Sequence, residues 1–98
     1  MNLRELLEVV KDENLGQRQL ESYRDDLIHL HSSMQLRAAE LEKQEARFFM
    51  ASHLDTDIAT KRAWRVTDAG QELISLNREL KAIVKEIDSL KSRIYSLL

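Results

Sequence analysis

Residues 66–97 read VTDAGQELISLNRELKAIVKEIDSLKSRIYSL, and this stretch decides the fold. Its apolar residues recur at alternating steps of three and four, which is the heptad pattern of a coiled-coil helix. The ten seam positions are Val66, Ala69, Leu73, Leu76, Leu80, Ile83, Ile87, Leu90, Ile94 and Leu97. Since all ten are apolar, we predict one helix over residues 57–98. Its Gly70 is a weak point, because glycine costs roughly 1 kcal/mol relative to alanine inside a helix. The residues expected at the buried centre of the assembly are Val66, Leu73, Leu76, Leu80, Ile83, Ile87, Leu90 and Ile94.

A second long helix is predicted over residues 17–52. Apolar residues again recur every seven positions, at Leu20, Leu27, Met34, Leu41 and Phe48. The other column of this repeat contains the polar residues Arg37 and Gln44, so the seam is imperfect. Ala38 takes the place of Arg37 if the helix follows a straight 3.6-residue period.

Short segments precede and join the two long helices. A short amphipathic helix is expected over residues 2–12, where apolar residues follow a helical period. The chain should reverse over residues 52–57, with Asp55 or Thr56 as the N-cap of the second long helix. A short break between two long helices gives an antiparallel hairpin. We therefore predict an all-α single domain over residues 1–98, in which a long, coiled-coil-like antiparallel hairpin carries a short N-terminal helix and assembles into a helical oligomer.

The composition agrees with an all-helical chain. Its 98 residues include two glycines and no proline, too few turn residues for a β-rich fold. Without cysteine, the chain has neither disulfides nor thiolate chemistry. No apolar run approaches the roughly 18 residues of a membrane span, and the first ten residues do not read as a signal peptide. We therefore expect a cytoplasmic protein without a membrane partner, and its net charge of −2 gives no strong pull toward nucleic acid.

Catalytic and metal-binding constellations are missing from the sequence pattern. His29 and His31 are two residues apart and therefore point to different faces of a helix, whereas a metal pair needs a spacing of three or four. The serines fall on predicted helices, and the two glycines, Gly16 and Gly70, are isolated. We expect no enzyme activity, no metal, no cofactor and no small-molecule substrate.

The predicted helix 57–98 has more apolar surface than one partner helix can cover. Ile74, Val84, Tyr95 and Leu98 lie outside its seam. The short N-terminal helix spans only about 15 Å, so it can cover part of the open end of the hairpin at most. We therefore expect the chain to bind to itself as a homo-oligomer.

An acidic column lies beside the same seam. It consists of Glu72, Glu79 and Glu86, spaced by seven. Such columns often select partners in coiled coils. Since Arg47 is the only complementary residue expected on the opposing flank, we predict that the glutamates face solvent or the cations of a second subunit.

A basic patch with the single tryptophan is predicted near the tip of the hairpin. It consists of Lys61, Arg62, Trp64, Arg65, Lys43 and Arg47. In a continuous helix Trp64 falls opposite the seam, where its own chain has nothing obvious to cover it. An aromatic ring among cations suits stacking on an unpaired base while the cations meet phosphates. The alternatives are that Trp64 packs in a subunit interface or is simply exposed.

Two stretches of the chain carry a resemblance to a known family. One runs from Tyr23 through His31-Ser32-Ser33 to Leu41-Glu42-Lys43-Gln44, and the other is Ile87-Asp88-Ser89-Leu90-Lys91-Ser92-Arg93. The first resembles the central helix of the UvsY-type phage recombination mediators, and the second is similar to their C-terminal helix. The resemblance implies a small oligomeric helical protein in a bacterial or phage-infected cell. Such a protein binds single-stranded DNA and helps to load a recombinase.

A protein-only function is the alternative. The same apolar stripe could grip another protein, as in a coiled-coil adaptor, an assembly chaperone or a small inhibitor. Salt separates the two hypotheses, because binding through phosphates weakens steeply as salt rises and apolar docking does not.

Overall fold

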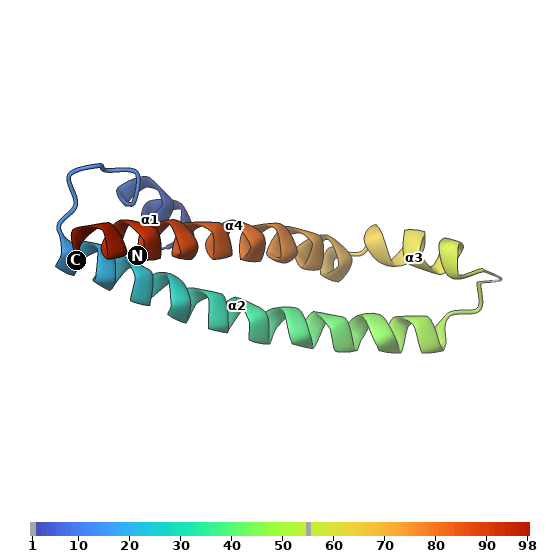
Figure 1. Cartoon of the computed structure of the whole chain (residues 1–98). Coiled ribbons are helices and arrows are strands. Elements are labelled where there is room, and N and C mark those ends of the chain that lie inside the picture. The colour runs from blue at the N-terminus through green and yellow to red at the C-terminus, as the bar shows by residue number, and fades with distance from the viewer. Residues whose placement is uncertain (1, 55) are drawn as a thin grey trace.

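The chain folds into a long antiparallel helical hairpin with a short helix on one side (Figure 1). The computed structural model describes residues 2–54 and 56–98. The helices are α1 (Leu3–Val9), α2 (Gln17–Ala51), α3 (Asp57–Arg65) and α4 (Asp68–Leu97), and the described residues contain no strand. The all-α hairpin predicted from the sequence is confirmed. The molecule measures 58 × 21 × 18 Å along its principal axes.

Side-chain and backbone caps set where the helices begin. The Asn2 Oδ1 accepts a hydrogen bond from the Glu5 backbone N–H at 2.9 Å, which starts α1. At the start of α2 the Gly16 N–H donates to Gln19 Oε1 at 3.0 Å. Thr56 caps α3 by accepting from the Ala59 N–H at 3.0 Å. The predicted reversal after Ser52 is confirmed, and Asp55, the other predicted cap, lies outside the described residues.

The predicted helix 57–98 is wrong as a single element, because the chain breaks between α3 and α4. Val66 ends α3, and the extended backbone of Thr67 begins a new helix. The Thr67 Oγ1 accepts from the Gly70 N–H at 3.0 Å and donates to the Trp64 carbonyl at 2.6 Å. The break therefore has a cap of its own. Its sequence signal, Thr67-Asp68, repeats the Thr56-Asp57 pair that starts α3.

The break also changes the role predicted for Gly70. This glycine is buried in the first turn of α4 rather than in a helix interior. A Cβ atom added there would overlap the carbonyl group of Trp64. The absence of a side chain is what lets the start of α4 approach the end of α3 so closely.

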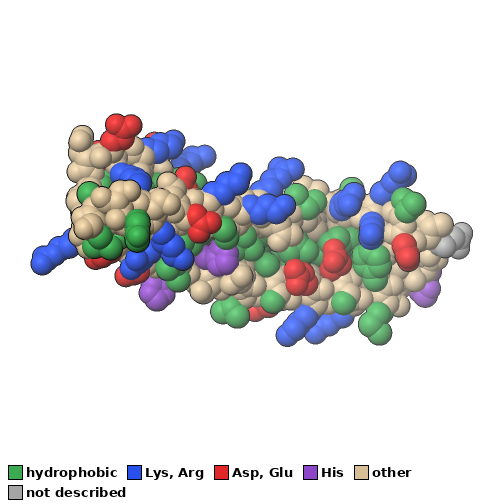
Figure 2. All heavy atoms as spheres, in the orientation of Figure 1, with side chains coloured by type: hydrophobic (Ala, Val, Ile, Leu, Met, Phe, Trp, Pro, Cys, Tyr) green, Lys and Arg blue, Asp and Glu red, His purple; other side chains and the backbone are tan. Residues whose placement is uncertain are grey.

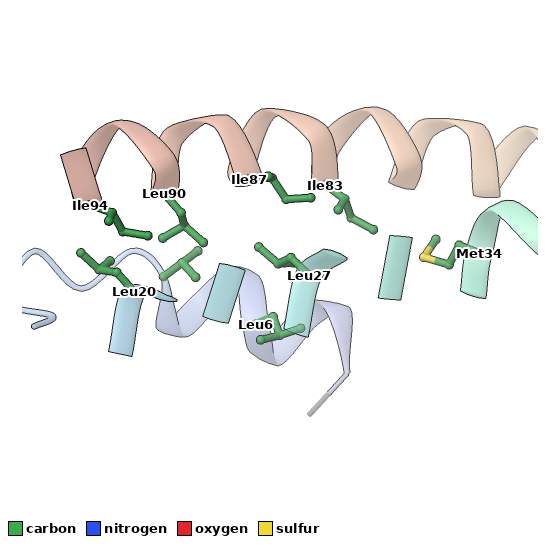
Figure 3. Close-up of a cluster of buried hydrophobic side chains, with 9 residues drawn as sticks. Leu6, Leu20, Leu27, Met34, Ile83, Ile87, Leu90 and Ile94 are labelled. Atoms are coloured by element: carbon green, nitrogen blue, oxygen red, sulfur yellow. The ribbon is translucent and has the colours of Figure 1, made fainter. Parts of the chain in front are cut away.

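Most of the predicted seam is buried between α2 and α4, as Figure 3 shows for the half near the chain termini. The buried seam residues of α4 are Leu73, Ile83, Ile87, Leu90 and Ile94, and Leu76 and Leu80 are partly buried against them. Val66 and Leu97 are the exceptions. Leu97, at the end of α4, is 53% exposed. Val66 is 80% exposed, so its place in the seam was wrongly predicted, because the helix ends there and the heptad phase is lost.

On α2 the apolar seam follows a straight helical period. Ala38 is 5% exposed and belongs to the core, whereas Arg37 lies on the flank of the hairpin and is exposed. Ala38 therefore replaces Arg37 in the seam, as expected for a helix without strong supercoiling. Arg37 is left free to form a contact across the hairpin.

The short helix α1 folds back onto the hairpin near the chain termini. Leu6 and Val10 are buried at 1% and 3% exposure and join the core formed by α2 and α4. Arg93 of α4 donates to the backbone carbonyls of Val10 and Asp12, both at 2.5 Å. The helix ends at Val9 rather than at the predicted residue 12. α1 is thus held against one side of α4. None of the described helices has an apolar stretch that could cross a bilayer.

Candidate binding surfaces

Trp64, which was predicted to be uncovered by its own chain, is buried. It is 6% exposed and packs with Leu41 and Leu73 in a second core cluster. Its ring lies 5.6 Å from that of Phe48 on α2, centroid to centroid, at an interplanar angle of 56°. The expectation failed because it placed Trp64 by the heptad phase of a continuous helix. The break at Val66–Thr67 lets α3 turn this residue toward α2 instead.

The cations predicted around Trp64 lie on two different sides of the hairpin. On α2, Lys43 and Arg47 are exposed. Each residue of an α-helix adds a rotation of about 100°. Lys43 is two residues from both the buried Leu41 and the partly buried Glu45, so its side chain points about 200° away from theirs. Lys43 and Arg47, four residues apart, therefore share the outer face of α2. The structure does not bring them together with the cations of α3.

The α3 cations form a smaller group. Lys61, Arg62 and Arg65 are all exposed, and among the described residues none of them is in an ion pair. Arg62 points away from the hairpin, because Thr60 and Trp64, two residues to either side, are both buried. Lys61 and Arg65 border a groove of about 210 Å³ at the tip. This tip groove is also lined by Glu45, Phe49, Trp64, Gly70, Leu73, Ile74 and Asn77.

Glu72, which was predicted to face solvent or a second subunit, has a partner within the chain. The Arg37 guanidinium donates to both of its carboxylate oxygens, with Nε at 2.6 Å and Nη2 at 3.1 Å. The hydrogen bonds of Arg37 to Glu72 and then to Glu40 raise the pKa of Arg37. Arg37 was missed because it had been assigned to the seam. The pair ties α2 to α4 along the flank of the hairpin.

The two flanks of the α2–α4 hairpin differ in what covers them. α1 lies along one flank, where it borders a groove of about 520 Å³ with Glu79, Ala82, Lys85 and Glu86 of α4, and Lys85 borders the groove on the other flank as well. A groove of about 400 Å³ lies on the other flank, and its lining residues are His31, Gln35, Leu80, Lys81, Val84 and Lys85. We call this second groove the middle groove, and the flank that carries it the open flank. α1 does not line it.

The open flank exposes apolar side chains with a basic border. Val84 is 45% exposed in the middle groove. Ile28, 41% exposed, is three residues before His31 and falls on the same side of α2. Lys81 and Lys85 border the groove, and no carboxylate lines it. Figure 2 shows hydrophobic side chains along the line between the two long helices and many Lys and Arg side chains along the α3–α4 edge. From the sequence, Val84 was named as apolar surface outside the seam and His31 only as a histidine without metal-binding spacing. Ile28, Lys81 and Lys85 were missed, because they flank the seam and carry no pattern of their own.

Other exposed apolar side chains lie outside the middle groove, among them Met50, Leu54 and Ile58 around the turn between α2 and α3. Leu36, 71% exposed, is two residues from the buried Met34 and Ala38 and so points to the outer face of α2. Tyr95 and Leu98 are exposed near the end of α4. No group of three or more acidic, histidine or cysteine side chains that could hold a metal was found among the residues the structure describes. The predictions of no enzyme activity and no cofactor stay predictions.

Comparison with known proteins adds no relative. No family model, curated protein or solved structure matches the chain. The resemblance to the UvsY-type mediators therefore rests on the two sequence stretches alone.

Proposed function

We propose that this protein is a non-enzymatic helical hairpin that acts by binding another protein along its open flank. The observation that carries the proposal is the asymmetry of the two flanks: α1 covers one, and the other keeps the apolar middle groove with Val84 and Ile28 exposed. This corresponds to the adaptor, assembly chaperone or small inhibitor hypothesis rather than to the DNA-binding one. The burial of Trp64 in the chain's own core removes the residue on which base stacking depended.

The chemistry of the groove favours a helical partner. An apolar floor between two antiparallel helices accepts the apolar face of a third helix, as in other helix-in-groove complexes. Lys81 and Lys85 at its border select a partner with acidic residues beside that face. Burial of the apolar floor contributes about 25 cal/mol per Å² removed from water, and the affinity is what remains after the entropic costs of association.

Site-specific photo-crosslinking tests this proposal. A benzoylphenylalanine residue replaces Val84 in one variant and Leu36 in the matched control, which is equally apolar but on the outer face of α2. We expect a discrete protein adduct at position 84 and none at position 36 after irradiation in cells, with the adduct identified by mass spectrometry. Equal labelling at both positions, or no protein adduct at position 84, would exclude the proposal.

A second candidate function is binding of single-stranded DNA by α3, as part of a recombination mediator. The observation that favours it is the group of exposed cations Lys61, Arg62 and Arg65 on one short helix, which have no ion pairs within the described chain. Without an exposed aromatic ring, binding would rest on phosphate contacts and would weaken steeply with salt. Recombinase loading and a cytoplasmic location are part of the same hypothesis.

Titration of labelled oligo-dT at several salt concentrations tests this second candidate. Each of the substitutions Lys61→Ala, Arg62→Ala and Arg65→Ala should flatten the logarithmic salt slope by up to about 0.7. The controls Lys43→Ala and Arg47→Ala remove the same charge from the other side of the hairpin and should leave the slope unchanged. A parent protein that does not bind, or equal effects at all five positions, would exclude a site on α3.

A further inference from the structure

The turn between α2 and α3 forms the end of the molecule opposite the chain termini (Figure 1). We call the described residues of this end, 43–54 and 56–65, the tip. We infer that the tip docks end-on on a membrane surface that contains anionic lipids. This contact goes beyond the proposed function, because it leaves the middle groove free for a protein partner.

The outermost helical residues of the tip include exposed aliphatic side chains. Met50, in the last turn of α2, is 88% exposed, and Ile58, in the first turn of α3, is 66% exposed. Leu54, in the turn between the two helices, is 50% exposed. Single exposed aliphatic side chains are common, but three around one turn favour an apolar contact at this end of the molecule.

On α2, two cations follow Met50 along the same face. Arg47 is three residues before Met50, or about 4.5 Å further from the end of the hairpin. Lys43 is seven residues before Met50, or about 10 Å. Both cations are exposed, and among the described residues neither is in an ion pair. The outer face of α2 thus changes from aliphatic to basic within one turn.

The same order occurs on α3. Lys61 and Arg62 are three and four residues after Ile58, or about 4.5–6 Å further from the end of the hairpin, and share its face. Arg65 follows at about 10 Å. All three cations are exposed. Both arms of the hairpin therefore carry an aliphatic side chain outermost and cations behind it.

The position of the cations on two different sides of the hairpin discriminates between partners. Lys43 and Arg47 lie on the outer face of α2, whereas Arg62 points away from the hairpin on α3. A nucleic-acid strand along one side of the molecule would contact only one of these groups. A plane across the end of the hairpin contacts both. A lipid surface is such a plane, and its anionic headgroups attract Lys and Arg side chains.

The spacing along the helices fits the depth of a membrane interface. Peripheral protein segments bury apolar side chains about 5–10 Å into the boundary between headgroups and acyl chains, while Lys and Arg stay with the headgroups. Cations about 4.5–10 Å behind Met50 and Ile58 reach the headgroups when these two side chains are inserted. Phosphate contacts alone, as in nucleic-acid binding, would leave the aliphatic side chains without a role.

The charge of the tip segment differs in sign from that of the chain. Residues 43–65 contain five cations and three carboxylates, whereas the whole chain has a net charge of −2. Among the three, Asp57 lies in the first turn of α3, where the helix dipole offsets its charge. The expectation of no membrane partner rested on the lack of a spanning segment, and a peripheral contact needs none.

Fluorescent labelling tests insertion of the tip, because the natural chain contains no cysteine. Ile58→Cys and the control Leu36→Cys, which is similarly exposed but lies in the middle of α2, each receive a nitrobenzoxadiazole dye. We expect blue-shifted, brighter emission at position 58 and no change at position 36 on addition of phosphatidylcholine vesicles with about one third phosphatidylserine. Vesicles of phosphatidylcholine alone should change neither.

Vesicle flotation measures the binding itself. Arg62→Ala should weaken binding to the phosphatidylserine vesicles by about fivefold. Met50→Ser and Ile58→Ser should each weaken it by about tenfold, with unchanged helix content by circular dichroism. The control Arg78→Ala removes an exposed cation ten residues, or about 15 Å, into α4 and should bind like the parent.

Three results would overturn this inference. One is a parent protein that does not float with phosphatidylserine vesicles. The second is an equal loss for Arg62→Ala and Arg78→Ala, which would mean that the hairpin lies flat on the lipid. The third is a dye at position 58 that responds to oligo-dT but not to vesicles, which would assign the tip cations to nucleic acid. None of these results affects a crosslink from position 84 to another protein, which tests the proposed function separately.

Discussion

Gly70 lies so close to the backbone carbonyl of Trp64 that a methyl group at position 70 would overlap it. This contact fixes the angle between α3 and α4. It also directs the tryptophan toward Phe48 on the opposite arm of the hairpin. A residue without a side chain at the start of one helix thus sets which face of the previous helix is buried.

Replacing Gly70 with alanine should therefore destabilise the protein, although alanine is the better helix former. Overpacking against rigid backbone typically costs about 1–3 kcal/mol. Urea unfolding followed by circular dichroism measures the change in the free energy of unfolding. The control is Gly16→Ala, where an added Cβ would meet only the Gln19 side chain at 3.8 Å. A stabilised Gly70→Ala variant would contradict the close approach of α3 and α4.

The fluorescence of the single tryptophan should report a buried ring. Trp64 is 6% exposed, so we expect blue-shifted emission and weak quenching by acrylamide in the native protein, with a red shift on unfolding. Addition of oligo-dT should leave the emission unchanged, even if the α3 cations bind DNA. Strong quenching by oligo-dT would restore the base-stacking role that the sequence predicted for Trp64.

Two seam positions that look alike in the sequence should respond differently to truncation. Ile83 is fully buried, so Ile83→Ala should cost about 2–5 kcal/mol of the free energy of unfolding. Val66 is 80% exposed, and Val66→Ala should change it by less than about 0.5 kcal/mol. Thermal or urea melts of both variants measure the difference. Equal losses would mean that the heptad continues through residue 66 and that α3 and α4 are one helix.

Thr67 should be required for the start of α4. Thr67→Ala removes both the N-cap acceptor for Gly70 and the hydrogen bond to the Trp64 carbonyl, which should cost about 0.5–2 kcal/mol. Thr67→Ser keeps the hydroxyl group and should retain most of the stability. Melts of the two variants that coincide would show that the hydroxyl does not cap this helix.

Arg93 should hold α1 on the hairpin. Its guanidinium donates to the carbonyls of Val10 and Asp12, directly after α1. In Arg93→Ala we expect faster amide hydrogen exchange in α1, while exchange in the centre of α2 stays slow. Lys91→Ala removes a nearby exposed cation as the control. Unchanged exchange in α1 would mean that Leu6 and Val10 alone keep it in place.

The sequence by itself determined the two arms of the hairpin, their reversal after Ser52 and most of the buried seam. These features follow from local rules. An apolar residue every three or four positions gives a helix one buried stripe, and Thr56 is a residue type that caps the N-terminus of the helix that follows it. The sequence also contained the second start signal, Thr67-Asp68, although the unbroken apolar repeat around it argued for a continuous helix.

Only the tertiary structure decided the rotational phase of α3, and with it the burial of Trp64 and the exposure of Val66. That phase depends on what α3 packs against, since Phe48 lies 16 residues away in sequence and Gly70 lies in the next helix. The pairing of Arg37 with Glu72 and the choice of the flank covered by α1 have the same origin. Each is set by contacts between segments distant along the chain, where helical periodicity carries no information about which face meets which partner.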